Sequence, residues 1–149
     1  MKLEKRALQL TILIGGLIPV LAGGAGAFAG VGMIPHTVAE PSLDSHFRYL
    51  SGLLLAIGLA FWSAVPDIER KTGQVRLLTA IVVTGGLARA YGLITGETPG
   101  LAMRLALIME LAVTPLLCLW QARIAAVDAR TRRPKFKLPV APGRSAPLP

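Results

Sequence analysis

Charged residues are scarce in this sequence, and the few that occur are unevenly distributed. Only 16% of its 149 residues are charged and 53% are hydrophobic, with a mean hydropathy of +0.59. A soluble domain of this size usually carries about 25% charged residues. The deficit indicates that lipid rather than water surrounds much of the surface of what is, by length, a single domain.

Cysteines and aromatic residues are also few, which excludes several classes of protein. The single cysteine, Cys118, cannot form an internal disulfide, and neither CxxC nor Cys/His metal-binding spacing occurs. Aromatic residues make up 5% of the chain, so the net charge of +8 does not indicate a nucleic-acid partner. Motifs of the GxSxG, HExxH and phosphate-loop types are absent, and we assign no catalytic residue and no metal ligand.

Long apolar runs dominate what remains, and four of them are long enough to cross a bilayer. We expect an all-α bundle of four transmembrane helices within residues 1–125, with spans at about residues 7–33, 47–65, 75–95 and 100–122. Residues 126–149 are basic and proline-rich, and we expect a cytoplasmic tail there. The start of the chain also fits a secretory signal, but the three spans that follow favour a retained first helix.

Small residues and prolines indicate how these helices pack and where they end. Small residues recur at four-residue steps in the first span, which would let a second helix approach closely in lipid. The two rows are Ala22, Gly26 and Gly30, and Gly15, Pro19, Gly23 and Ala27. A kinked helix without a tight partner is the alternative. We expect Ser42 or Ser45 to cap the second helix, and Pro115 to kink the fourth.

The distribution of basic residues predicts the orientation. Most of the 16 lysines and arginines lie before the first span, in the turn between the second and third, or after the fourth. The positive-inside rule then places both termini in the cytoplasm. We therefore expect a multi-pass inner-membrane protein whose immediate partners are membrane lipids.

An arginine and a glutamate lie inside the third and fourth apolar runs. Arg89 at that depth costs roughly 2.5–3.5 kcal/mol on insertion scales, so it needs a partner or water. Glu110 is the only acidic residue of the next run, and a short turn makes the two helices antiparallel neighbours. We expect the two side chains to meet, either as an ion pair that fixes the helix register or as a pocket for a lipid headgroup, a proton or a quinone-like ring.

The connection between the first two spans adds polar residues to the same half of the bundle. We group Asp44, His46 and Arg48 with Arg89 and Glu110 as a ligand-binding or structural polar cluster. A histidine in the position of His46 is more often simply solvated than part of a site.

His36 and Arg104 lie in the same half of the bundle but outside this cluster. His36 lies in the same loop as His46, and the pair is a weak signal for metal binding. Arg104 lies on a different helix face from Glu110 and would either reach the headgroups or pair with Glu97.

Three short segments together resemble the bacterial DUF4345 family. They are residues 43–52 (LDSHFRYLSG), residues 85–89 (GGLAR), and Glu110 with Pro115. The resemblance covers about residues 8–125 and implies a small four-span protein without an assigned activity. It also implies that Asp44, Arg48, Arg89 and Glu110 are the positions to test. The layout is similar to that of DoxX-like membrane proteins, some of which are associated with quinone or thiol oxidation, by analogy of fold alone.

Two functional classes follow from these observations. The first is a non-enzymatic accessory or scaffold subunit that associates with lipid or with other subunits of a membrane complex. The second is a redox accessory that binds a lipid- or quinone-like ligand, or a membrane enzyme. A deep cavity at Arg89 and Glu110 would favour the second class, and a filled ion pair the first. A transporter is disfavoured because the four spans lack inverted halves, and the sequence indicates no particular cofactor.

Overall fold

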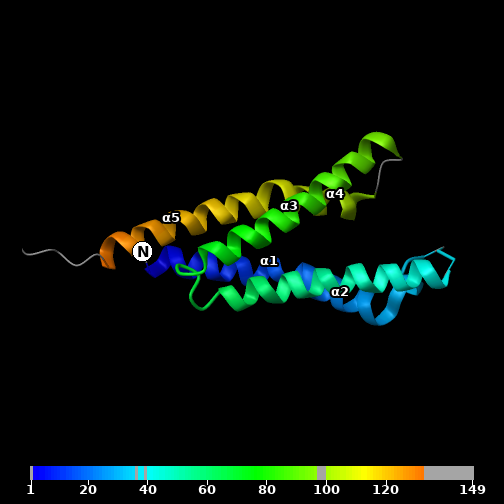
Figure 1. The fold of residues 1–149 in the computed structure, drawn as a ribbon, viewed down its shortest axis with the longest axis horizontal. Coiled ribbons are helices and arrows are strands. Elements are labelled where there is room, and N and C mark those ends of the chain that lie inside the picture. Colours follow the sequence, from blue (N-terminus) through cyan, green and yellow to red (C-terminus); the bar gives the residue numbers. More distant parts are fainter. Residues whose placement is uncertain (1, 36, 39, 97–99, 133–149) are drawn as a thin grey trace, which may run out of the picture.

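The computed structural model describes residues 2–35, 37–38, 40–96 and 100–132, and the secondary structure of these ranges is helical, without strands. Four helical segments in them are long and apolar enough to cross a membrane (Figure 1). They are Lys2–Met33, Pro41–Ala64, Thr72–Thr95 and Leu101–Arg132. The predicted all-α bundle of four transmembrane helices is confirmed.

Two of the four segments contain more than one type of helix. The first consists of α1 (Lys2–Ala29) and a 3-10 turn, η1 (Gly30–Met33). The second and third are α2 (Pro41–Ala64) and α3 (Thr72–Thr95). The fourth consists of α4 (Leu101–Ile108), a π-helical turn η2 (Met109–Val113) and α5 (Thr114–Arg132).

Two helix ends differ from the expected positions. α2 begins at Pro41, because Glu40 rather than a serine is its N-cap and accepts a hydrogen bond of 2.8 Å from the Leu43 N–H. Proline suits the first helical turn, where its missing N–H would have no partner in any case. α5 continues to Arg132 and so includes residues 126–132, at which we expected the tail to begin. Residues 133–149 of the expected tail lie outside the described residues.

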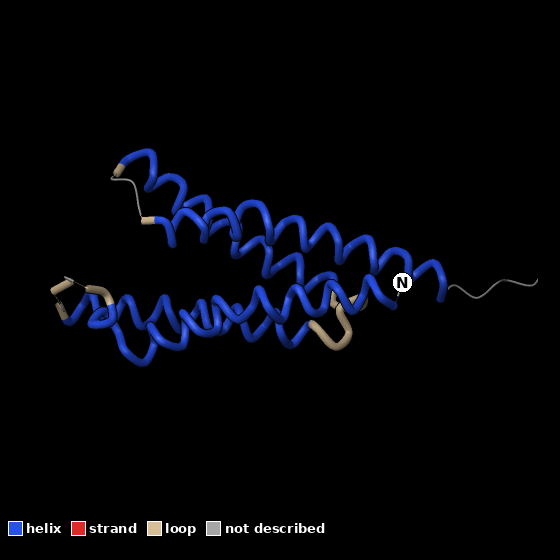
Figure 2. The backbone as a smooth tube through the Cα atoms, turned by 180° about the vertical axis from the view of Figure 1, so that it is seen from behind, coloured by secondary structure: helices blue, strands red, loops and turns tan. Residues whose placement is uncertain are grey.

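The helices form two pairs that meet at one end and separate at the other (Figures 1 and 2). α1 lies along α2, whereas α3 lies along α4, η2 and α5. Between the pairs, α1 approaches α5 and α2 approaches α3, but the described part of α4 comes near only α3 and η2. We call the end that holds the N-terminus and the end of α5 the closed end, and the opposite end the open end.

Glycines allow α1 and α2 to pack closely. A Cβ on Gly23 would lie 2.7 Å from the Ser51 carbonyl oxygen, and one on Gly58 would lie 2.7 Å from a Val20 methyl group. Such contacts replace hydrophobic association, which lipid does not provide. The predicted small-residue packing is thus present at Gly23 and also at Gly26, which faces Ser51, whereas nothing lies within 4 Å of a Cβ built on Gly15.

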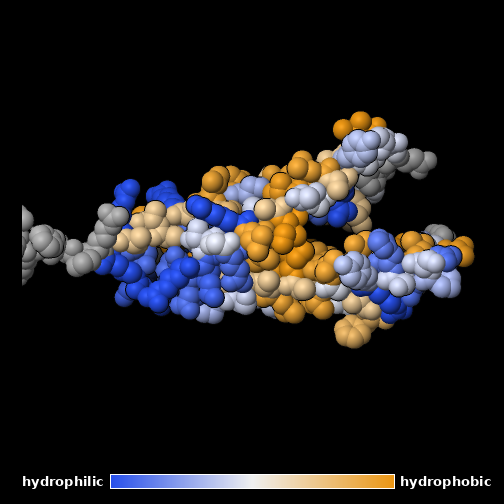
Figure 3. Space-filling model, viewed as in Figure 1, coloured by the Kyte–Doolittle hydropathy of each residue, from blue (hydrophilic) through white to orange (hydrophobic). Residues whose placement is uncertain are grey.

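The hydrophobic core lies toward the closed end, where the two pairs meet. Its buried members are Leu8, Ile12, Ala64, Val65, Ile68 and Val75. Apolar side chains gather over the middle of the molecule, and hydrophilic ones gather at the closed end (Figure 3). The connection between α2 and α3 therefore joins the pairs through apolar contacts as well as through the chain itself.

Candidate functional site

Arg89 of α3 and Glu110 of η2 form an ion pair inside the membrane-spanning region. The Arg89 Nε donates to the Glu110 Oε2 and the Nη2 donates to the Oε1, both at 3.0 Å. This is the two-pronged geometry in which the guanidinium matches a carboxylate best. The Arg89 Nη1 also contacts the Met103 sulfur at 2.9 Å. The side chains are 37% and 20% exposed, so the pair lies at the bundle surface rather than in its core.

The backbone around Glu110 brings it close to α3. A Cβ on Gly86 would lie 2.9 Å from the Glu110 Cβ, so only glycine permits this approach. The π-helical turn Met109–Val113 immediately precedes Thr114 and Pro115. Pro115 has no N–H to donate and its ring crowds the preceding turn, which accounts for the local widening. The Thr114 hydroxyl donates to the Met109 carbonyl at 2.8 Å, five residues back along this turn. The kink we expected at Pro115 thus takes the form of a π-helical turn.

Asp44 and Arg48 form a second pair, which closes the C-terminal end of α1. The Arg48 Nη1 donates to the carbonyl oxygens of Ala27 and Phe28 at 3.0 and 2.7 Å. The Arg48 Nε donates to the Asp44 Oδ2 at 2.7 Å, and the Asp44 Oδ1 accepts from the Val31 N–H at 2.8 Å. Backbone groups at a helix end have no hydrogen-bond partner within the helix. The Asp44–Arg48 pair supplies partners for these groups at the end of α1.

Gly30 makes this cap possible. Its φ of +67° lies in the left-handed region, where glycine carries no steric penalty. A Cβ at this position would also lie against the Asp44 carboxylate and the Arg48 guanidinium. Asp44 and Arg48 of the LDSHFR segment therefore cap the C-terminal end of α1.

The structure thus brings the expected polar residues together as two separate pairs. Arg89 with Glu110 belongs to one helix pair, whereas Asp44 with Arg48 lies on the other, and the two helix pairs diverge at the open end. His46 is exposed and has no polar partner among the described residues. His36 lies outside the described residues.

The two alternatives for Arg104 both stay predictions. Arg104 is exposed, and its side chain has no polar partner in the described part of the chain. Glu97, its expected partner, lies outside that part.

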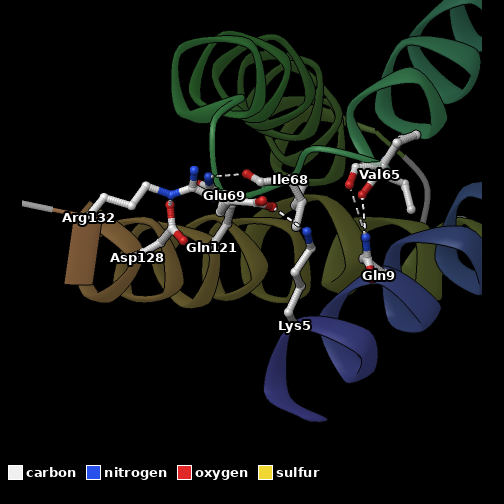
Figure 4. Close-up of polar contacts among 9 residues, drawn as sticks. Lys5, Gln9, Val65, Ile68, Glu69, Gln121, Asp128 and Arg132 are labelled. Carbon is white, nitrogen blue, oxygen red and sulfur yellow. Dashed lines mark hydrogen bonds and ion pairs between the residues drawn. The ribbon is translucent and has the colours of Figure 1, made fainter. Parts of the chain in front are cut away.

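Two glutamines bond to the chain around the connection between the helix pairs, at the closed end (Figure 4). The Gln9 Nε2 of α1 donates to the Val65 carbonyl oxygen at 2.7 Å. The Gln121 Nε2 of α5 donates to the Ile68 carbonyl oxygen at 2.6 Å and to the Thr72 hydroxyl at 3.0 Å. Gln121 is fully buried. The amides therefore hold the chain between α2 and α3, one from α1 and the other from α5.

Ion pairs surround these amides. Lys5 lies 2.8 Å from the Glu69 Oε2, and Arg132 lies 2.6 Å from the Asp128 Oδ2 on the same helix (Figure 4). Burial raises the pKa of the Glu69 carboxyl, but the hydrogen bonds from Lys5 and from the Glu69 backbone N–H outweigh it and hold the pKa below its ordinary value. At neutral pH this carboxylate is therefore ionised and ties α1 to the connection between α2 and α3.

Residue type and spacing alone do not reveal these closed-end contacts. Gln9 and Gln121 lie inside or beside apolar runs, and amide side chains in membrane spans usually bond to a neighbouring segment. Their positions therefore indicate that each contacts another segment. The pattern of the runs does not say which backbone carbonyls they reach.

Two cavities accompany these features. One, of about 310 Å³, lies at the closed end among ionic side chains that include Lys2, Glu4, Lys5, Glu69 and Arg123. The other, of about 320 Å³, is an apolar groove between α1 and the fourth helical segment. Arg89 and Glu110 line neither of these cavities. Within the described residues, no cluster of three or more histidine, cysteine, aspartate or glutamate side chains is placed to hold a metal ion.

One protein family matches most of the chain. The family described as a domain of unknown function (DUF4345) matches residues 7–121. No curated protein and no solved structure matches the chain. The match runs from Ala7 on α1 to Gln121 on α5, so it includes parts of all four helical segments and both polar pairs.

Proposed function

We propose that this chain, which belongs to the DUF4345 family, whose description assigns no activity, is a non-enzymatic accessory or scaffold subunit. It associates with membrane lipid or with a larger membrane complex. The chain is a multi-pass membrane protein. We assign it to the inner membrane, with both termini and residues 126–149 on the cytoplasmic side, because its basic residues gather at the ends of the spans on that side.

One observation carries this proposal: Arg89 and Glu110, which lie inside the membrane-spanning region, form an ion pair with each other. Arg89 and Glu110 satisfy each other through two hydrogen bonds. Neither of the two cavities described above is lined by these residues. Because the two charged groups already bond to each other, a structural role for the pair accounts for this geometry without a ligand.

Divergence of the helix pairs supports an association role. Large apolar side chains on α3, such as Leu87, Tyr91 and Ile94, are 59–84% exposed in the isolated chain. A surface of this kind within a membrane is covered by lipid or by other transmembrane helices. The exposed faces at the open end are thus available to a neighbouring subunit.

The alternative is a membrane protein that binds a lipid- or quinone-like ligand at Arg89 and Glu110. The π-helical turn at Glu110 favours it, because such turns occur frequently at functional sites. In this case the exposed edge of the Arg89 guanidinium would receive a ligand carbonyl.

Extraction of the tagged chain from its native membrane in polymer-bounded lipid particles, followed by native mass spectrometry, distinguishes the two. The variants to compare are the parent and the double substitution Arg89→Leu with Glu110→Leu. We expect a stoichiometric second polypeptide that both proteins retain. A small ring-containing ligand that only the parent retains would establish the alternative instead. Release of the bare chain from both would contradict both proposals.

A further inference from the structure

The apolar groove lies at the depth of the bilayer core, on the side of α1 that faces the fourth helical segment. Its volume is about 320 Å³. The lining residues are Thr11, Ile14, Gly15 and Ile18 of α1, and Met109, Val113 and Leu117 of η2 and α5. All belong to segments long and apolar enough to span the membrane.

Two features of the backbone keep this groove open. α1 approaches α5 near the closed end but does not approach η2, so the two walls diverge toward the open end. On the α1 side, nothing lies within 4 Å of a Cβ built on Gly15. On the opposite side, the wider π-helical turn contributes Met109 and Val113. Thus the missing Gly15 side chain and the separation of the pairs create the space together.

The chemistry of the lining excludes a polar occupant. Thr11 is the only lining residue with a polar side chain, and its hydroxyl already donates to the Ala7 carbonyl at 2.9 Å. The backbone groups of these helices bond within the helices. An occupant that brought a hydrogen-bonding group into the groove would find no partner, at a cost of several kcal/mol in hydrocarbon surroundings.

The shape of the groove suits a flexible hydrocarbon chain. Its walls diverge toward the open end and leave it partly open. A rigid transmembrane helix, about 10–12 Å wide with its side chains, could insert only a ridge of side chains there. A single hydrocarbon chain can follow the groove and matches its apolar lining.

We propose that this groove binds one hydrocarbon chain of a membrane lipid, which enters from the open end. The occupant's tip points toward the core residues Ile12 and Leu117. The chain is held by van der Waals contact, because burial in protein offers little hydrophobic gain over the surrounding lipid tails. This inference rests on the proposed association with lipid and names the place and the chemical class of the contact.

The test uses purified full-length protein in nanodiscs of phosphatidylcholine that carries a photoreactive diazirine near the end of one chain. Gly15→Leu fills the groove from α1, and Val113→Phe fills it from η2. Gly24→Leu is the matched control, because Gly24 is also a half-buried α1 glycine with nothing within 4 Å of its Cβ position. Labelled peptides are mapped by mass spectrometry after brief illumination.

We expect labelling of the parent to concentrate on Ile14, Ile18 and Met109. It should fall severalfold in both groove-filling variants and stay unchanged in Gly24→Leu. Equal labelling of all lipid-facing helices, unaffected by either filling variant, would overturn the proposal. So would a change from dimer to monomer on filling the groove, which would assign it to contact between copies. The measurement contains no partner subunit, so its failure is separate from a failure to find the proposed complex.

Discussion

The guanidinium of Arg89 and the carboxylate of Glu110 meet edge to edge, through two hydrogen bonds of 3.0 Å between neighbouring membrane-spanning segments. Each side chain neutralises the charge of the other in a region where lipid tails offer no polar partner. Gly86 of α3 lets Glu110 approach this closely, because a Cβ on Gly86 would lie 2.9 Å from the Glu110 Cβ.

Loss of one member of this pair should destabilise the bundle. In Arg89→Ala the Glu110 carboxylate is left alone inside the membrane, and we expect a loss of about 1–3 kcal/mol, between the values for exposed and buried pairs. Glu110→Gln should cost less, because its amide oxygen still accepts a hydrogen bond from Arg89. Thermal unfolding in detergent micelles measures both. Arg104→Ala, which removes an arginine without a described partner, is the control, and equal melting of all four proteins would contradict a structural role for the pair.

The fold and this pair were predictable for the same reason. Apolar runs long enough to cross a bilayer leave few alternatives to helices. A short turn between two such helices makes them neighbours, so Arg89 and Glu110 had to lie on adjacent segments. The divergence of the helix pairs was not predictable, because an apolar side chain that faces lipid and one that faces another helix have the same character.

The capping role of Asp44 and Arg48 could not be predicted from the sequence, for a different reason. Their effect depends on the left-handed conformation of Gly30 and on carbonyls that lie far back in the sequence, at Ala27 and Phe28. Residue type and spacing suggest a charged loop but do not specify which backbone groups it satisfies.

Removal of Arg48 should loosen the end of α1. Arg48→Ala withdraws the donors from two carbonyls and leaves Asp44 without its cation, with an expected loss of about 1–3 kcal/mol. Arg48→Lys should restore only part of this, because an ammonium lacks the planar fork. Unfolding in micelles gives the stability, and amide hydrogen exchange at residues 27–31 locates the effect. His46→Ala should change neither, and a loss spread evenly over all helices would argue against a capping role.

The close contact of α1 and α2 should be sensitive to a single methyl group. Gly23→Ala would place a Cβ 2.7 Å from the Ser51 carbonyl oxygen, so α2 must move away, at a cost of about 1–3 kcal/mol. Gly24→Ala, one residue along the same helix, meets nothing within 4 Å and should be neutral or slightly stabilising. Their difference in melting temperature tests the packing, since an equal effect of the two would rule out tight contact at Gly23.

The ion pair at the closed end should make stability depend on pH. The pKa of Glu69 is held below its ordinary value of 4.5, so the folded protein favours the ionised form. Its contribution is complete above pH 4.5 and is lost as the pH falls through the lower pKa of the folded protein. Lys5 faces this carboxylate, as does the like charge of Asp128, which weakens the effect.

Glu69→Gln isolates this contribution. The variant should be less stable than the parent at neutral pH, and the difference should shrink as the solution is acidified below about pH 4.5, where the parent carboxylate takes up a proton. Unfolding midpoints in micelles over this range provide the comparison. Parallel pH profiles for the two proteins would show that Glu69 does not stabilise the closed end by its charge.

The orientation in the membrane is open to a direct chemical test. The basic residues predict that the loop between α1 and α2 faces away from the cytoplasm. In a Cys118→Ser background, His46→Cys places a single thiol at an exposed position near the start of α2. We expect a membrane-impermeant maleimide to label it in cells whose outer barrier alone has been permeabilised. A cysteine at Lys71, in the turn between α2 and α3, should then react only after the inner membrane is opened. The reverse pattern would invert the topology and move residues 126–149 to the other side.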